Sequence, residues 1–251
     1  MRGGALVTGG ARRIGRALAL CAAEAGYAVC VHHRAHEDEA RAVVAEIASK
    51  GGRAIALSAE LRSEDEVRGL IPRAAQALGL PLTLLINSAA AFEDDRVGAL
   101  SSELWTLHMA VNLRAPVLLA EAFAAQVPEV AEDALVLNMI DQRVLKPTPQ
   151  FFSYSLSKAG LLNATRMLAQ ALAPRVRVNG IGPGPTLMSV HQRPEDFAAE
   201  AAGTLLGKPV DPDEICSAAR YLIDARAVTG QMIAVDSGQH LGWKTPDIVK
   251  D

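Results

Sequence analysis

The stretch "VTGGARRIGRALAL", residues 7–20, decides the fold. It follows a short apolar run at residues 5–8 and leads directly into a helical pattern. A glycine-rich turn at such a junction lets the backbone approach a pyrophosphate, which then lies at the N-terminus of the helix. The alternative is a tight turn without a ligand. The surrounding pattern of strands and helices favours a dinucleotide site.

The rest of the chain repeats this strand-and-helix pattern. Seven runs of β-type sequence occur at residues 5–8, 28–32, 54–58, 82–87, 134–140, 176–181 and 232–236. They are continuously apolar, as expected of parallel strands that are buried on both faces. Helix-length segments separate them, which predicts repeated βαβ units. We therefore expect an α/β protein with one doubly wound (Rossmann) domain over residues 1–251. Its seven-stranded, mostly parallel sheet should have helices on both faces and a ligand crevice beyond the carboxyl ends of the strands.

Local signals indicate where some helices begin and end. A capping box, "SEDE" at residues 63–66, should open a helix over residues 67–78, although Pro72 implies a kink or a late start. A second helix carries Tyr154 and should stop at Pro174. Residues 185–209 have a weak pattern, and we expect them to form a substrate loop over the crevice.

Composition excludes several classes of partner. Half of the 251 residues are apolar, about a fifth are charged, and the net charge is −3, so neither nucleic acid nor an anionic membrane is an expected partner. The N-terminus lacks the pattern of a signal peptide, and no apolar run approaches the roughly 20 residues that cross a bilayer. The cysteines (Cys21, Cys30 and Cys216) are widely spaced among apolar neighbours and should be reduced core thiols. A cytoplasmic protein that acts on a small molecule is expected.

Basic side chains near the glycine-rich turn indicate which dinucleotide binds. Arg34 follows His33 at the end of the second strand, and Arg12 and Arg13 lie in the turn itself. Arginine pairs with phosphate through two hydrogen bonds, so these residues favour NADP, with its 2′-phosphate, over NAD. Arg12 could instead be part of a solvated cationic surface.

A metal site at the nearby histidines is not expected. His32, His33 and His36 are close in sequence. Consecutive residues of a strand point to opposite faces, and no carboxylate or cysteine at a suitable spacing completes a ligand set.

A carboxylate, a phenol and an amine come together later in the chain. Tyr154 and Lys158 are four residues apart at the start of a helix, so they share one helix face, and Asp141 precedes them at the end of an apolar run. A phenol ordinarily has a pKa near 10, and a neighbouring ammonium stabilises the phenolate. Tyr154 could then act as a general acid near neutral pH.

These motifs together resemble the short-chain dehydrogenase/reductase family over nearly the whole chain. The matching positions are Thr8, Gly9 and Gly15 in the turn, Asn87 with the "SAA" after it, Asn112, Tyr154, Lys158 and "GPGP" at residues 182–185. The resemblance implies that Tyr154 is the general acid and that Lys158 holds the nicotinamide ribose and lowers the pKa of Tyr154. It also implies that Asn112 keeps a proton-relay water in place. The cofactor-binding residues it implies are Gly9, Arg12, Arg13, Ile14, Gly15, His33, Arg34, Glu60, Leu61, Asn87, Ser88, Ala89, Tyr154, Lys158, Pro183 and Gly184.

The role of Asn112 also has a physical basis. Pro116 lies four residues later in a helical pattern and has no N–H. The main-chain carbonyl of Asn112 therefore lacks its intrahelical partner and is free to bind water.

The sequence departs from the family pattern at three places. Arg13 replaces the middle glycine of the turn, "NSAA" at residues 87–90 replaces Asn-Asn-Ala-Gly, and Asp141 stands where the family has a serine that polarises the substrate carbonyl. An ionised aspartate only accepts hydrogen bonds. Either Asp141 is protonated, or its substrate presents N–H groups.

An arginine in the turn and an aspartate in place of the serine resemble the pteridine reductase branch, which includes dihydromonapterin reductases. That resemblance implies catalytic residues Tyr154, Lys158, Asp141 and Asn112, with Asp141, Tyr154 and Phe92 contacting a pterin. Phe92 would stack on the pterin ring, although an aromatic residue there could also simply pack. We thus expect an NADPH-dependent reductase of a pterin-like substrate.

Two other functions stay open at this point. One is a carbonyl reductase for an oxoacyl or sugar-like substrate, and the other is a sensor that binds NADP(H) without catalysis. A homotetramer is expected from the family alone. The tail at residues 240–251 could cover a neighbouring subunit's crevice or pack locally.

Overall fold

The computed structural model describes residues 2–129 and 133–243. Its sheet has seven strands in the order β3-β2-β1-β4-β5-β6-β7, and every neighbouring pair is parallel. The strands are β1 Gly4–Thr8, β2 Ala28–His33, β3 Ala54–Ser58, β4 Leu82–Asn87, β5 Ala134–Met139, β6 Val176–Pro183 and β7 Met232–Val235. The predicted doubly wound α/β fold is confirmed, and the sheet is parallel throughout.

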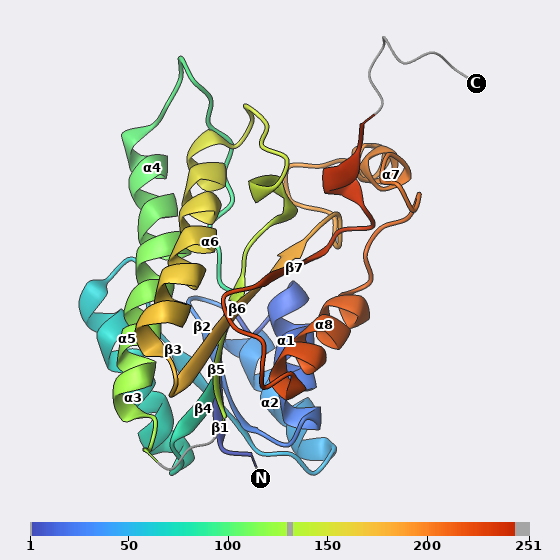
Figure 1. The fold of residues 1–251 in the computed structure, drawn as a ribbon. Coiled ribbons are helices and arrows are strands. Elements are labelled where there is room, and N and C mark those ends of the chain that lie inside the picture. Colours follow the sequence, from blue (N-terminus) through green and yellow to red (C-terminus); the bar gives the residue numbers. More distant parts are fainter. Residues whose placement is uncertain (1, 130–132, 244–251) are drawn as a thin grey trace.

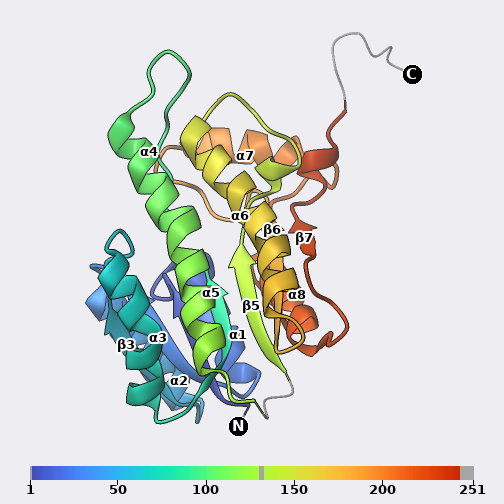
Figure 2. The ribbon, with the colours of Figure 1, turned by 60° about the vertical axis from the view of Figure 1, so that its left-hand side comes forward.

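Helices cover both faces of this sheet (Figures 1 and 2). One face carries α1 Arg13–Glu24, α2 Glu37–Ser49 and α8 Pro212–Asp224, and the other carries α3 Glu64–Leu78, α5 Ala115–Gln126 and α6 Phe152–Leu172. α4 Ser102–His108 continues through a π-helical turn, Met109–Arg114, into α5. The remaining short elements are the 3₁₀ turns Gln142–Val144 and Gln239–Leu241, and α7 Pro194–Ala202.

The alternation of side chains along the strands explains the two layers of helices. In β1, Val7 packs with the α1 and α8 side, while Leu6 packs with the α3 and α5 side. Successive residues of a strand point to opposite faces, so a strand between two layers of helices must be apolar at every position. The core is therefore two apolar layers, one on each face of the sheet.

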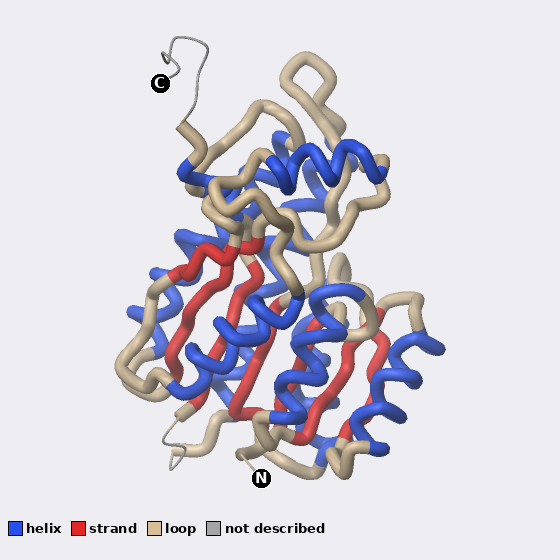
Figure 3. Tube along the Cα trace, turned by 90° about the vertical axis from the view of Figure 1, so that its right-hand side faces the viewer, coloured by secondary structure: helices blue, strands red, loops and turns tan. Residues whose placement is uncertain are grey.

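The position of β1 locates the ligand crevice. β2 leaves on one side of β1 and β4 on the other, so the strand order reverses there. Ligands of open α/β sheets bind at such a switch point, beyond the carboxyl ends of the strands. Figure 3 shows the loops and α7 gathered beyond one end of the sheet, above this point.

The helix predictions are largely confirmed, with one correction. α6 runs through Leu172 and ends before Pro174, as expected. α3 begins at Glu64, capped by the hydroxyl of Ser63, and continues through Pro72, so the late start was wrong. The capping box is also incomplete, because the carboxylate of Glu66 accepts the N–H of Glu60.

Three further expectations concern the chain as a whole. Cys21, Cys30 and Cys216 are free and buried, as predicted. Among the described residues, no helix combines the length and the apolar character that a membrane span requires. Of the C-terminal tail, residues 244–251 lie outside the described residues, and Trp243 is largely exposed.

Candidate functional site

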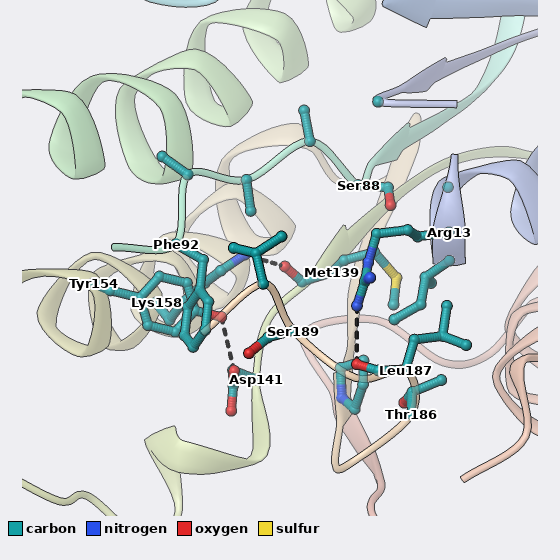
Figure 4. Close-up of a pocket in the computed structure, with 18 of the residues that line it drawn as sticks. Arg13, Ser88, Phe92, Met139, Asp141, Tyr154, Lys158, Thr186, Leu187 and Ser189 are labelled. Carbon is teal, nitrogen blue, oxygen red and sulfur yellow. Dashed lines mark hydrogen bonds between the residues drawn. The ribbon is translucent and has the colours of Figure 1, made fainter. Parts of the chain in front are cut away.

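A cavity of about 1220 Å³ opens at the carboxyl ends of the strands (Figure 4). The predicted site residues that line it are Gly9, Arg12, Arg13, Ile14, Gly15, His33, Arg34, Glu60, Leu61, Ser88, Ala89, Phe92, Asp141, Tyr154, Lys158, Pro183 and Gly184. Asn87 and Asn112 are not in this wall. The fold therefore brings together residues from one end of the sequence to the other in one place.

The glycine-rich turn is built for close backbone approach. Gly9 has φ +64°, and a Cβ there would lie 2.9 Å from the Cα of Ala89. A Cβ on Gly15 would lie 2.1 Å from the carbonyl oxygen of Gly9. Both positions therefore require glycine, because any side chain would collide with neighbouring backbone.

Two polar side chains hold this turn in place. The Nδ1 of His32 accepts the N–H of Gly9 at 3.1 Å, and its Nε2 donates to the carbonyl of Ala59 at 3.0 Å. Burial lowers the pKa of His32 to about 4, so the ring is neutral. The hydroxyl of Thr8 accepts the N–H groups of Ser88 and Ala89 at 3.0 and 3.1 Å, which joins β1 to the end of β4.

Asn87 does not line the cavity but takes part in a buried hydrogen-bond network beneath it. Its Nδ2 donates to the Oδ1 of Asn138 at 2.8 Å, and Asn138 donates in turn to the hydroxyl of Thr165 at 2.9 Å. This buried row of hydrogen bonds connects β4 and β5 to α6. Asn87 therefore helps to fix the positions of the strand ends on which the site is built.

The end of the cavity beside β2 is basic. Arg12 and the ring of His36 approach within 3.1 Å, and Arg34 lines the cavity from the end of β2. The Nδ1 of His33 is buried and has no hydrogen-bond partner. No group of three or more potential metal-binding side chains occurs within the described ranges.

Arg13 serves a different part of the cavity. Its φ is +53°, the left-handed region that glycine occupies more readily. Its guanidinium donates to the carbonyl of Leu187 at 2.9 Å (Figure 4). It also donates to the carbonyl of Met188 at 2.9 Å. Arg13 thus lines the same cavity as Arg12 and Arg34, but its guanidinium is bound to the loop after β6.

This loop, residues 185–209, closes one side of the cavity. It contains α7, and besides Arg13 it is held by the ring of His191, 3.0 Å from the carbonyl of Phe92. Glu200 of α7 accepts from Gln192 at 2.6 Å and from Gln239 at 2.8 Å. The loop thus spans from the glycine-rich turn to the Phe92 wall.

Asp141, Tyr154 and Lys158 meet at the centre of the cavity wall (Figure 4). The phenol of Tyr154 donates to Oδ2 of Asp141 at 2.7 Å. The other oxygen, Oδ1, accepts the N–H of Arg143 at 2.8 Å. The ammonium of Lys158 donates to the carbonyl of Met139 at 2.7 Å and lies 5.8 Å from the centre of the Tyr154 ring.

The protonation states of these groups follow from burial. Burial and the neighbouring Asp141 carboxylate raise the pKa of Tyr154 well above its usual value. The predicted lowering of this pKa by Lys158 is therefore wrong here: the enclosed position and the carboxylate favour the neutral phenol. Burial also raises the pKa of Asp141, against the N–H of Arg143 and the phenol of Tyr154, which lower it. Burial lowers the pKa of Lys158 to about 8.

Asn112 lies behind this wall, in the π-helical turn. Its side chain accepts the N–H of Ala91 at 2.8 Å and donates to the carbonyl of Ala91 at 2.9 Å and to the hydroxyl of Ser157 at 3.1 Å. These bonds occupy the amide, so its side chain positions the loop after β4. The helix is irregular here, just before Pro116, as the missing N–H of a proline leads one to expect.

Phe92 belongs to an aromatic cluster. Its ring stacks on Phe151 with a centroid distance of 4.3 Å and an interplanar angle of 8°. The same ring meets Tyr154 edge-on at 4.7 Å. Phe92 therefore lines the cavity and packs at the same time, so the two interpretations of this residue are compatible.

Known proteins match the chain over almost its whole length. A family model described as enoyl-(acyl carrier protein) reductase, a branch of the short-chain dehydrogenases/reductases, matches residues 9–240. An uncharacterized oxidoreductase from Methylorubrum extorquens is 32% identical over 93% of this chain and 96% of its own length. The protein belongs to the short-chain dehydrogenase/reductase family. A second relative in the family, a 3-oxoacyl-[acyl-carrier-protein] reductase from Synechocystis, is 31% identical over 93% of this chain and 95% of its own length.

A solved structure is more similar still to this chain. It is FolM alternative dihydrofolate reductase 1 from Brucella canis, complexed with NADP. The two chains are 50% identical, with a TM-score of 0.93 and coverage of 98% of this chain and 96% of the other.

A buried polar network of this short-chain dehydrogenase/reductase escaped the sequence analysis. The carboxylate of Asp95 accepts the N–H and the hydroxyl of Ser153 at 2.9 and 2.5 Å, and that hydroxyl lies 2.7 Å from Nδ1 of His108. Nε2 of His108 accepts the N–H of Glu93 at 3.2 Å. The network fixes the start of α6, directly before Tyr154. Its directly bonded members lie up to 58 residues apart with no recognisable spacing, so the sequence carries no signal for them.

Proposed function

We propose that this protein is an NADPH-dependent reductase that transfers hydride to a pterin-like substrate of the dihydropterin or folate type. The observation that carries the proposal is the position of Asp141, whose carboxylate contacts the phenol of Tyr154 inside the cavity. A carboxylate is suited to bind the amino group and ring N–H groups of a pterin. The 50% identity with FolM alternative dihydrofolate reductase 1 supports the same substrate class.

The glycine-rich end of the cavity fits NADP. The close approach of Gly9 and Gly15 to neighbouring backbone leaves room for a pyrophosphate at the N-terminus of α1. Arg12 and Arg34 would bind the 2′-phosphate, and His33 lines the cavity beside them. When bound, NADPH supplies the hydride. Further contacts are proposed for Glu60, Leu61, Ser88, Ala89, Ile14, Pro183 and Gly184, with Asn87 supporting the floor.

Tyr154 would supply the proton. Its phenol is neutral over the physiological range, because burial and Asp141 raise its pKa, so it can donate to the nitrogen of a C=N bond as the adjacent carbon accepts hydride. Lys158 would orient the nicotinamide ribose through its ammonium. The main-chain carbonyl of Asn112 would hold a water that returns the proton to Tyr154.

Asp141 and Phe92 would bind the substrate ring. Each oxygen of Asp141 already accepts one hydrogen bond, from Tyr154 or from Arg143, and a carboxylate oxygen has capacity for a second. Ring N–H groups can therefore bind beside the Arg143 contact, while the Tyr154 hydroxyl, which carries a single proton, turns from Asp141 when it protonates the substrate nitrogen. Phe92 would pack on the ring from the side of the aromatic cluster.

A substrate and cofactor panel tests this proposal. The purified protein should oxidise NADPH in the presence of 7,8-dihydropterins or dihydrofolate, should be much slower with NADH, and should not turn over simple ketones. Activity with ketones alone would contradict it. Binding of NADPH without turnover of any of these compounds would instead support a non-catalytic NADP(H) sensor.

The pH dependence of activity should have an alkaline limb that belongs to Lys158. Its pKa is lowered to about 8 by burial, so the ammonium is present below that pH and is lost as pH rises through it. The pKa of Tyr154 is raised well above 10, so the phenol stays protonated over the same window. We expect kcat/KM to fall as pH rises through about 8. Arginine stays charged below about pH 12, so Lys158→Arg should move this limb upward. A flat profile through pH 8 in the parent enzyme would contradict the assignment.

A carbonyl reductase is the second candidate, because the Synechocystis 3-oxoacyl reductase is 31% identical to this chain. In that case Asp141 would be a tolerated variant of the serine that other family members use. The substrate panel separates the two, since an oxoacyl thioester or sugar-like ketone would then be the preferred substrate.

We also propose that residues 1–251 form one domain, with residues 185–209 as its substrate loop, and that the protein is a cytoplasmic homotetramer. Exposed apolar side chains on α4 and α6 support association through these helices. Trp105 is 40% exposed, Leu156 40% and Met167 66%. Light scattering of the purified protein tests the oligomeric state.

A further inference from the structure

Arg143 extends the site beyond the residues that hold the ring. It lies two residues after Asp141, in the 3₁₀ turn Gln142–Val144. The N–H of Arg143 donates to Oδ1 of Asp141, and the N–H of Leu145 donates to the carbonyl of Gln142 at 2.9 Å. The backbone of Arg143 is therefore fixed relative to the carboxylate that we propose to bind the pterin ring.

The side chain of Arg143 lies at the end of an aromatic ladder, the row of packed rings formed by Tyr154, Phe92 and Phe151. Its guanidinium lies over the ring of Phe151, 5.1 Å from the centroid. The ring of Phe151 also stacks on Phe92, and Phe92 meets Tyr154 edge-on. The ladder starts at Tyr154, which is 6% exposed, and reaches the exposed segment at residues 145–150. It thus leads from the proposed proton donor to the mouth of the cavity, which Arg143 and Gln150 also line.

The charge of Arg143 acts on Asp141 and Tyr154, whose pKa values it lowers, but the guanidinium is not neutralised by a salt bridge within the part of the chain that the structure describes. No carboxylate there forms an ion pair with it, whereas Arg96 and Arg193 pair with carboxylates two and three residues away, at 2.9 Å in each case. Its side-chain hydrogen bond is a long one of 3.4 Å to the hydroxyl of Thr148. A guanidinium held over an aromatic ring keeps its N–H edge free, and that edge matches a carboxylate through two parallel hydrogen bonds.

We propose that Arg143 is a binding subsite for a carboxylate on the tail of the substrate, so that the enzyme prefers a folate-type dihydropterin with an arylamide and glutamate tail over one with a neutral side chain. This inference rests on the proposed function and names the substrate class of the same site. The aryl group would pack along Phe92 and Phe151, and a glutamate carboxylate would bind the guanidinium. Recognition here adds to the ring contacts of Asp141 and does not replace them.

Steady-state kinetics with two substrates test the inference. Reduction of 7,8-dihydrofolate is compared with that of 7,8-dihydrobiopterin, whose side chain is neutral, in the parent enzyme, in Arg143→Gln and in Arg41→Gln. Arg41 is exposed on α2, pairs with Glu37 and does not line the cavity, so it is a matched charge control. Loss of one charge-assisted interaction should raise KM for dihydrofolate about tenfold in Arg143→Gln, with kcat little changed. The ratio of kcat/KM for dihydrofolate to that for dihydrobiopterin should fall by about the same factor, and Arg41→Gln should leave it unchanged.

The outcomes separate this inference from the proposed function. If the parent enzyme reduces both substrates and Arg143→Gln leaves their ratio unchanged, the subsite is wrong and the pterin reductase stands. If the parent enzyme reduces dihydrobiopterin but not dihydrofolate, the subsite is likewise wrong and the pterin reductase likewise stands. If the parent enzyme reduces neither, both proposals fail.

A measurement on the unmodified enzyme keeps the test independent of how the variant folds. p-Aminobenzoyl-glutamate carries the tail without the ring and should inhibit competitively against dihydrofolate. Its inhibition should weaken as NaCl is raised, because salt screens a partly exposed ion pair. p-Aminobenzamide lacks the carboxylates and should not inhibit. Equal inhibition by both compounds, or inhibition that salt does not change, would overturn the subsite.

Discussion

Replacing Tyr154 with phenylalanine should lower kcat/KM for a dihydropterin about a thousandfold, since a positioned general acid contributes about 10²–10⁴ to the rate. The substitution removes only the hydroxyl that donates to Asp141. The ring would keep its edge-on contact with Phe92 at 4.7 Å, so the wall of the cavity should stay in place. The measurement is the steady-state rate of NADPH oxidation over a range of dihydropterin concentrations, from which kcat/KM is obtained.

A fluorescence titration of Tyr154→Phe with NADPH serves as the control. The cofactor should still bind, with a Kd within about fivefold of the parent value, because the loss of one hydroxyl contact costs about 1 kcal/mol. If binding persists and turnover also persists at the parent rate, the proton comes from another group and the role of Tyr154 is wrong.

Replacing Asp141 with serine should lower kcat/KM for a dihydropterin about a hundredfold, because hydrogen bonds to a charged group contribute about 1.5–3 kcal/mol and at least one is lost. Serine restores the side chain that carbonyl-reducing family members use. In a pterin reductase, turnover of dihydropterins falls. In a carbonyl reductase, turnover of ketones survives or rises.

The isosteric change Asp141→Asn refines this result. Asparagine keeps the shape of the side chain and one acceptor oxygen but loses the charge that raises the pKa of Tyr154. If recognition depends on an ionised carboxylate, Asp141→Asn should lose nearly as much activity on dihydropterins as Asp141→Ser. Full activity in Asp141→Asn would show that the carboxyl group works in its protonated form.

The features that sequence predicts well are local. The continuous apolar runs predict the seven parallel strands, and the spacing of glycines in the turn at residues 7–20 predicts the cofactor end of the cavity. Tyr154 and Lys158 share a helix face because they are four residues apart. Each of these inferences needs only the geometry of one element and its neighbour in the chain.

The features that sequence missed depend on tertiary structure. The guanidinium of Arg13 binds carbonyls about 175 residues away, and no local pattern indicates where that loop lies. The pKa of Tyr154 follows from burial and from its contact with Asp141, neither of which a helix periodicity reveals. Pro72 predicts a kink in α3 or a late start, and the late start is wrong: α3 already begins at Glu64, and Leu70 and Ile71 pack in the core just before the proline.

The central claim is that the carboxylate of Asp141 recognises a nitrogen-rich ring beside the phenol of Tyr154. A crystal structure of the protein with NADP and a bound pterin measures this directly. We predict an oxygen of Asp141 within hydrogen-bonding distance, about 2.7–3.2 Å, of an amino or ring nitrogen of the pterin. A carboxylate turned away from the ring, or a pterin bound outside the cavity, would contradict the account.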